Sequence, residues 1–108
     1  MESKNAIKGL SALAQEGRLA VFKLLVKAGP EGIAAGEIAQ ALDLPPNTLS
    51  AQLTILANAD LVASRRAGRS IIYSANFAGM NRLLVYLMED CCQGRPEICT
   101  PPVKQACC

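Results

Sequence analysis

Residues 36–56 read GEIAQALDLPPNTLSAQLTIL and contain two helical patterns separated by a turn. The first pattern covers residues 36–42, and its inward-facing apolar positions are Ile38, Ala39 and Leu42. The second opens at Asn47 or a neighbouring residue, and its apolar face, spaced at four and three, consists of Leu49, Leu53 and Leu56. Asp43, Leu44 and Pro45 form the turn between them. Two helices joined by three or four residues predict a helix-turn-helix.

The segment that follows predicts a small β-hairpin. Residues 61–66 and 70–75 are short, rich in β-forming side chains and separated by a loop that contains Ala67 and Gly68. A hairpin directly after the two helices indicates a winged helix-turn-helix. Asn76 can cap a last helix, whose apolar stripe would be Phe77, Met80, Leu84 and Leu87.

Two amphipathic helices are predicted before residue 36, separated near Glu16 and Gly17, and Gly29 with Pro30 ends the second. Their apolar positions are Ile7, Leu10, Leu13 and Ala14, then Leu19, Phe22, Leu25 and Val26. The fold class is therefore mainly α with a small β-hairpin. Because 108 residues bury only a modest core, we expect a homodimer formed through the terminal helices. Residues 1–90 would form the DNA-binding and dimerisation domain, and residues 91–108 a cysteine-rich tail.

All five cysteines lie within residues 91–108, and the chain contains no histidine. They are Cys91, Cys92, Cys99, Cys107 and Cys108. Cysteines crowded beyond the last apolar segment indicate capture of a thiophilic species rather than core packing. The segment 91–108 is therefore the candidate sensing site.

The hydropathy and charge of the chain indicate its cellular compartment and its binding partners. No run of about 18 apolar residues and no export signal occurs, so we expect a cytoplasmic protein with no membrane partner. In that reducing compartment, thiols or metal-bound thiolates are favoured over structural disulfides. Although the net charge is only +2, residues 61–88 hold four arginines and no acidic residue. Such a basic strip is typical of phosphate contact, although a solvated hairpin remains the alternative.

Residues 9–75 resemble the ArsR/SmtB family of winged-helix metalloregulators. The matching positions are Leu13-Ala14, Arg18-Leu19, Gly36-Glu37-Ile38-Ala39, Leu44-Pro45, Leu49-Ser50, Leu53, Leu56, Gly68-Arg69 and Ile72-Tyr73. This resemblance implies a dimeric repressor that leaves its operator when a metal or metalloid binds. The tail resembles the family's C-terminal arsenic-responsive variant, in which a vicinal cysteine pair and a later cysteine bind arsenite.

The candidate DNA-contacting residues lie on the second helix and in the wing. They are Asn47, Thr48, Ser50, Gln52, Thr54, Arg65, Arg66 and Arg69. Gln52 is expected to read a base, because its amide can pair with adenine at two positions. Many relatives place a histidine or basic residue where Ala51 and Gln52 stand, so phosphate affinity must come from the wing arginines and other helices.

Arsenite and antimonite prefer three thiolate sulfurs, and soft thiolates select such ions over hard ones. The expected ligands are Cys91, Cys92 and Cys99, with Cys107 and Cys108 as further ligands or unused thiols. Redox or polysulfide sensing, organic trivalent arsenicals, and soft divalent ions such as lead or cadmium remain open. A four-cysteine zinc site lacks the usual paired spacing. No other cofactor is expected.

Two other protein classes fit the sequence less well. A thiol-dependent arsenate reductase needs an oxyanion-binding loop leading into a cysteine-bearing helix, and no Gly-rich loop of that kind occurs. A metallochaperone would leave the wing arginines and the second helix without a role. We therefore expect a regulator and not an enzyme.

Overall fold

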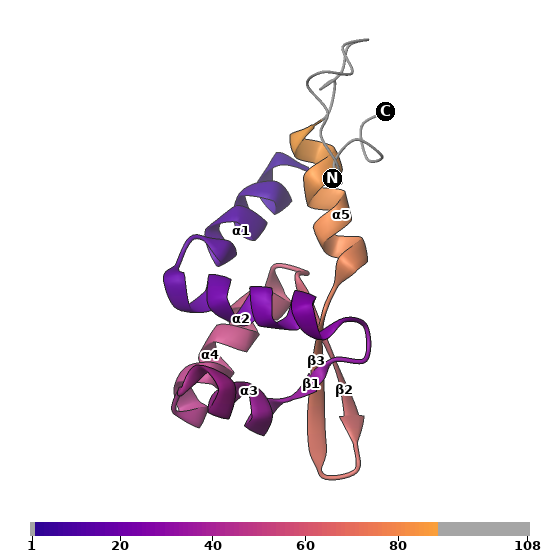
Figure 1. Ribbon diagram of the computed structural model, residues 1–108. Helices are drawn as coiled ribbons and strands as arrows, with labels where there is room; N and C mark the ends of the chain where they lie inside the picture. Colours follow the sequence, from indigo (N-terminus) through magenta and orange to yellow (C-terminus); the bar gives the residue numbers. More distant parts are fainter. Residues whose placement is uncertain (1, 89–108) are drawn as a thin grey trace.

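The structure, a computed structural model, describes residues 2–88 (Figure 1). In this part of the chain the elements are α1 (Ser3–Leu13), α2 (Glu16–Ala28), β1 (Ile33–Ala34), α3 (Ala35–Leu42), α4 (Pro46–Asn58), β2 (Val62–Ala67), β3 (Ser70–Ala75) and α5 (Phe77–Leu87). The winged helix-turn-helix predicted from the sequence is confirmed. Residues 89–108 lie outside the described residues, so the expected division at residue 90 stays a prediction.

The turn between α3 and α4 has the predicted length and a clear stop signal. Asp43 adopts the left-handed conformation, with φ of 51°. The Leu44 amide donates to the Ala39 carbonyl at 2.9 Å, so the end of α3 is closed by backbone hydrogen bonds. Helix α4 begins at Pro46, one residue before the expected Asn47, because proline fits the first turn of a helix, where its missing N–H is not needed.

The sheet has three strands in the order β1-β3-β2, all antiparallel. The predicted hairpin is confirmed, and Arg65 pairs with Ile72. Its loop consists of Gly68 and Arg69 alone, because Ala67 is the last residue of β2. Strand β1 was not predicted, because two residues are too short to show an alternating pattern. It pairs Ile33 with Tyr73, which joins the wing to the residues preceding α3.

The hydrophobic core lies where α2 meets α3, α4 and the sheet. Its most enclosed side chains, all under 2% exposed, are Leu25, Ile38, Leu53, Leu56, Leu61 and Val21. The predicted face of α4 is confirmed, since Leu49, Leu53 and Leu56 are all buried. On α2, Phe22 and Leu25 are buried as expected, whereas Leu19 and Val26 are 43% and 42% exposed.

The expected apolar stripe of α1 faces the core only at Leu13, which is partly buried against it. Ala6, Gly9 and Ala12 form its buried side, while Ile7 and Leu10 are 64% and 42% exposed. Small residues let α1 approach its neighbours closely: a Cβ at Gly9 would lie 3.3 Å from the Leu83 side chain of α5. Ile7 and Leu10 are therefore left uncovered by the other residues of the described range 2–88.

Arg18 connects the first two helices. Its Nε donates to the Ala12 carbonyl at 2.7 Å, and its NH2 group donates to the Ser11 carbonyl at 3.3 Å. Both carbonyls lie in the last turn of α1, where a cation complements the helix dipole. The Ser11 carbonyl also accepts a hydrogen bond from the Ala14 amide at 3.2 Å. The break between helices falls at Ala14 and Gln15, so Glu16 and Gly17 belong to the first turn of α2 and not to the break itself.

Helix α5 begins as predicted. The Asn76 side chain accepts a hydrogen bond from the Gly79 amide at 3.1 Å. Gly79 and Leu83 are buried, whereas Phe77 and Leu87 of the predicted stripe are 44% and 47% exposed. No helix among residues 2–88 is long and apolar enough to cross a lipid bilayer.

Candidate functional site

The first turns of α4 present a continuous polar surface. Asn47, Thr48 and Ser50 are exposed, as is Thr54 one turn further along. The Thr54 hydroxyl donates to the Ser50 carbonyl at 2.9 Å, which leaves its oxygen free to accept. No side chain caps the N-terminus of α4, so no side chain offsets the positive end of its helix dipole there. This surface can bind anionic groups and hydrogen-bond polar edges.

Gln52 is placed differently from these four residues. It is half-buried, and its Oε1 atom is buried without a hydrogen-bond partner among the described residues. A Cβ at Gly17 would collide with the Gln52 amide nitrogen, so the side chain packs against the start of α2. The expected position on the exposed face of α4 is therefore wrong, since in a helix residue 52 flanks the buried Leu49–Leu53 face. Its contact with a base stays a prediction.

The three arginines of the wing differ in their hydrogen-bond partners. Arg65 donates from its NH2 group to the Glu31 carbonyl at 2.7 Å, which fixes its guanidinium beside the loop that precedes β1. Arg66 and Arg69 are exposed, and neither has an ion-pair partner within residues 2–88. Arg69 lies next to Gly68, at the tip of the hairpin. All three arginines keep their charge, but the Glu31 carbonyl orients Arg65, whereas the side chains of Arg66 and Arg69 have no hydrogen-bond partner within residues 2–88.

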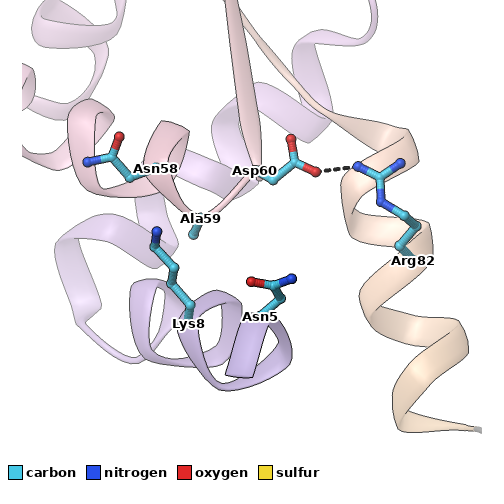
Figure 2. A pocket seen from close by; sticks show the side chains of 6 residues that line it. All are labelled: Asn5, Lys8, Asn58, Ala59, Asp60 and Arg82. Atoms are coloured by element: carbon cyan, nitrogen blue, oxygen red, sulfur yellow. Dashed lines mark hydrogen bonds and ion pairs between the residues drawn. The ribbon is translucent and has the colours of Figure 1, made fainter. Parts of the chain in front are cut away.

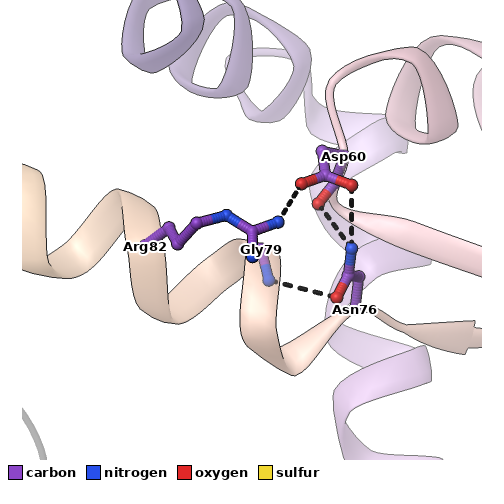
Figure 3. Close-up of polar contacts among 4 residues, drawn as sticks. All are labelled: Asp60, Asn76, Gly79 and Arg82. Atoms are coloured by element: carbon purple, nitrogen blue, oxygen red, sulfur yellow. Dashed lines mark hydrogen bonds and ion pairs between the residues drawn. The ribbon is translucent and has the colours of Figure 1, made fainter. Parts of the chain in front are cut away.

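Arg82, the fourth arginine of the basic strip, does not belong to this surface. It forms an ion pair with Asp60, which follows α4 (Figure 3). Asn76 Nδ2 also donates to Asp60, to the carboxylate at 2.9 Å and to the backbone carbonyl at 3.1 Å. The Gly79 amide donates a hydrogen bond to the Asn76 side chain. We call Asp60, Asn76, Gly79 and Arg82 the junction cluster.

The junction cluster joins the end of α4 to the start of α5. Asp60 adopts φ of 63°, a conformation that aspartate tolerates better than most residues. A Cβ at Gly79 would overlap the Asp60 carbonyl oxygen, so only glycine permits this approach. The sequence indicated Asn76 as a cap but not its second role, because the contact with Asp60 depends on the tertiary fold.

The candidate metalloid ligands Cys91, Cys92 and Cys99, together with Cys107 and Cys108, lie outside the described residues. Within residues 2–88, no group of three or more histidine, cysteine, aspartate or glutamate side chains is arranged to hold a metal ion. The sequence has neither cysteine nor histidine before residue 91. The thiolate site therefore stays a prediction from the sequence.

Comparison with known proteins agrees with this architecture. A family model described as a helix-turn-helix domain matches residues 13–65. The chain is 40% identical over 65 residues to the HTH-type transcriptional regulator NmtR of Mycobacterium tuberculosis, a match that covers 60% of this chain and 52% of NmtR. The chain thus spans about half the length of this curated relative.

Two solved structures show the same fold. NolR from Sinorhizobium fredii is 34% identical, with a TM-score of 0.63 and coverage of 81% of this chain and 84% of NolR. A homodimeric winged helix-turn-helix DNA-binding domain from Mycobacterium bovis, described as a possible ArsR-family transcriptional regulator, is 29% identical. Its TM-score is 0.65, with coverage of 81% and 80%. The chain carries a winged helix-turn-helix domain that is similar in sequence and fold to those of ArsR-family transcriptional regulators.

Proposed function

We propose that this chain is a homodimeric, DNA-binding transcriptional repressor that releases its operator when arsenite or antimonite binds the thiolates of Cys91, Cys92 and Cys99. The observation that carries the DNA-binding part is the joint exposure of the α4 polar surface and the wing tip. The sensing part rests on the five cysteines of residues 91–108. No catalytic step is needed for this role.

The DNA-binding part follows from the chemistry of the exposed groups. An α-helix fits the major groove of B-DNA, where hydroxyls and amides can bond base edges. Asn47, Thr48 and Ser50 offer these groups on α4, while Arg66 and Arg69 supply charge for phosphates. Helix α4 itself has no charged residue, so the wing has to provide much of the electrostatic attraction.

The dimeric part is supported by the uncovered apolar side chains of the terminal helices. Leu10 of α1 and Phe77 and Leu87 of α5 are each more than 40% exposed. Pairing these helices with those of a second copy would remove that surface from water. A twofold dimer would present two α4 helices to half-sites about 34 Å apart.

The sensing part follows from ligand softness. Trivalent arsenic and antimony prefer thiolate sulfur, and three cysteines complete their coordination. Cys91 follows Leu87, the last residue of α5, by four positions in the sequence, so binding there would act close to the terminal helix and could alter its pairing. A coupling of about 1 to 3 kcal/mol would weaken operator binding by roughly 5- to 150-fold.

Operator binding by the wing can be tested through its dependence on salt. In Arg65→Gln/Arg66→Gln/Arg69→Gln, the slope of log K against log salt should become shallower by about 0.9 for each phosphate that the wing no longer neutralises. A charge-matched control, Lys4→Gln/Lys23→Gln/Lys27→Gln, should retain most of the slope. Fluorescence anisotropy with the chain's own upstream DNA measures both, and equal slopes for the wing variant and the unaltered chain would refute the assignment.

The thiolate site can be tested by arsenite-dependent release of the same DNA. Single serine variants at Cys91, Cys92 and Cys99 should each lose release, while Cys107→Ser/Cys108→Ser serves as the matched control and should respond normally. Antimonite, cadmium, peroxide and polysulfide in parallel reactions identify the inducer class. If all three single variants still released DNA with arsenite, the proposed ligand set would be wrong even if DNA binding were intact.

A further inference from the structure

A cavity of about 320 Å³, lined mainly by residues with polar side chains, lies between α1, the end of α4 and α5 (Figure 2). It is lined by Asn5, Lys8, Asn58, Ala59, Asp60 and Arg82. Asn5 and Lys8 come from α1, Asn58 ends α4, and Arg82 comes from α5. The volume lies at the lower end of the range for small-molecule sites, which suits an occupant the size of phosphate or a short dicarboxylate.

The charges around the cavity favour an anion. Two cations, Lys8 and Arg82, line the cavity together with a single carboxylate, that of Asp60. The Asp60 carboxylate already pairs with Arg82 and accepts from Asn76. Lys8 has no ion-pair partner among the described residues, and the side-chain amides of Asn5 and Asn58 can donate N–H groups.

We propose that this cavity binds a small oxyanion, a carboxylate or a phosphate, held by Lys8, Arg82 and the two amides. A guanidinium offers a planar pair of donors to such a group, and an ammonium adds a point charge. The anion would compete with Asp60 for Arg82. Because Asp60 and Arg82 belong to the junction cluster, occupancy would act on the link between α4 and α5.

The cavity lies away from the apolar stripe of the terminal helices. On α5, Phe77 and Leu84 share one side, and Arg82 precedes Leu84 by two residues, which turns it by about 200° around the helix. Lys8 has the same offset from Leu10 on α1. A second copy seated on Leu10, Phe77 and Leu84 would therefore contact another side of these helices than the one that carries Lys8 and Arg82. The proposal does not depend on the proposed sensing function.

The test is a titration of the reduced full-length chain, followed by ¹H–¹⁵N correlation spectra at constant pH and ionic strength. Inorganic phosphate and succinate are added separately, so that the two oxyanion classes are distinguished. At least one should cause saturable shifts of the backbone amide signals of Asn58, Ala59 and Asp60. Shifts that grow linearly with both anions, without saturation, would overturn the proposal.

Two variants with opposite expected effects show whether the cavity residues act as proposed. Lys8→Gln should raise the dissociation constant about tenfold, because a charge-assisted hydrogen bond is lost. Asp60→Asn should lower it several-fold, since it removes the competing carboxylate while its amide oxygen can still accept from Asn76. Lys23→Gln, an exposed lysine of α2, is the charge-matched control and should bind as the unaltered chain does.

The opposite directions separate binding from damage to the fold, because loss of structure cannot tighten a complex. The spectra of both variants report on folding in the same samples. Unchanged affinity in Lys8→Gln, or weaker binding in Asp60→Asn, would contradict the assignment of these side chains.

Discussion

Helices α4 and α5 carry the same kind of apolar repeat, but among residues 2–88 the repeat of α4 is fully covered, whereas that of α5 is covered only in part. Leu49, Leu53 and Leu56 are at most 2% exposed, whereas Phe77 and Leu87 of α5 are 44% and 47% exposed. The inner side of α5 is instead formed by Gly79 and Leu83. Apolar spacing thus reveals that a face exists, but not whether the same chain or another one covers it.

The largest loss of stability should come from truncating a buried leucine of α4. Leu56→Ala removes a fully buried side chain and leaves a cavity, so the free energy of unfolding should fall by about 2 to 5 kcal/mol. Leu87→Ala on α5 is the matched control and should cost less than about 1 kcal/mol at concentrations where the chain is monomeric. Urea denaturation measures both. Equal losses would show that the two repeats are buried alike.

A second test concerns the inner side of α5. Gly79→Ala places a methyl group against the Asp60 carbonyl oxygen, a backbone atom that cannot easily move, and should cost about 1 to 3 kcal/mol. Gly36→Ala on α3 meets nothing within 4 Å and should be neutral or stabilise by about 0.5 to 1 kcal/mol. Thermal unfolding of the two variants compares a close contact with an open position. Similar midpoints for both would contradict the tight approach at the junction cluster.

The N-termini of α4 and α5 also differ, and this difference should have a smaller effect on stability. Helix α4 opens with Pro45 and Pro46 and no side-chain cap, while α5 opens with Asn76. Asn76→Ala should lower the free energy of unfolding by about 0.5 to 2 kcal/mol, since the cap is removed together with the bonds to Asp60. Asn47→Ala, in the first turn of α4, is the control and should change it by less than about 0.5 kcal/mol. The comparison fails if the two variants lose the same stability.

The smallest effect on the stability of the single chain should come from the outer side of α5. Phe77→Ser should change unfolding of the monomer little but should raise the dimer dissociation constant about tenfold, by removing an apolar anchor. Sedimentation equilibrium measures that constant. An exposed polar position such as Asn81→Ser serves as the control. An unchanged dissociation constant in Phe77→Ser would place the dimer contact elsewhere.

The sequence predicted the helix-turn-helix and the wing because their signals are local. The spacing of Leu49, Leu53 and Leu56, the turn at Asp43 and the cap at Asn76 each depend on neighbouring residues. Strand β1 and the position of Gln52 were missed, since both depend on contacts made across the fold: β1 pairs with β3, and Gln52 packs against Gly17 of α2.

The candidate site was predictable to a similar extent. The exposure of Asn47, Thr48 and Ser50 follows from helical periodicity, and that of Arg66 and Arg69 from the hairpin. The different roles of Arg65 and Arg82 could not be predicted. Their partners, the Glu31 carbonyl and the Asp60 carboxylate, are brought near only by folding.

The bonds from Arg18 to the last carbonyls of α1 brace the corner between α1 and α2. A change in the angle between α1 and α2 would break both hydrogen bonds of the Arg18 guanidinium. We therefore expect the two helices to move together as a rigid unit. Because α2 packs directly against α4, a displacement of α1 by a neighbouring copy would then be transmitted to the polar surface of α4 without involving α5. Arg18→Leu removes these hydrogen bonds, so it should weaken the effect on α4 of any displacement of α1.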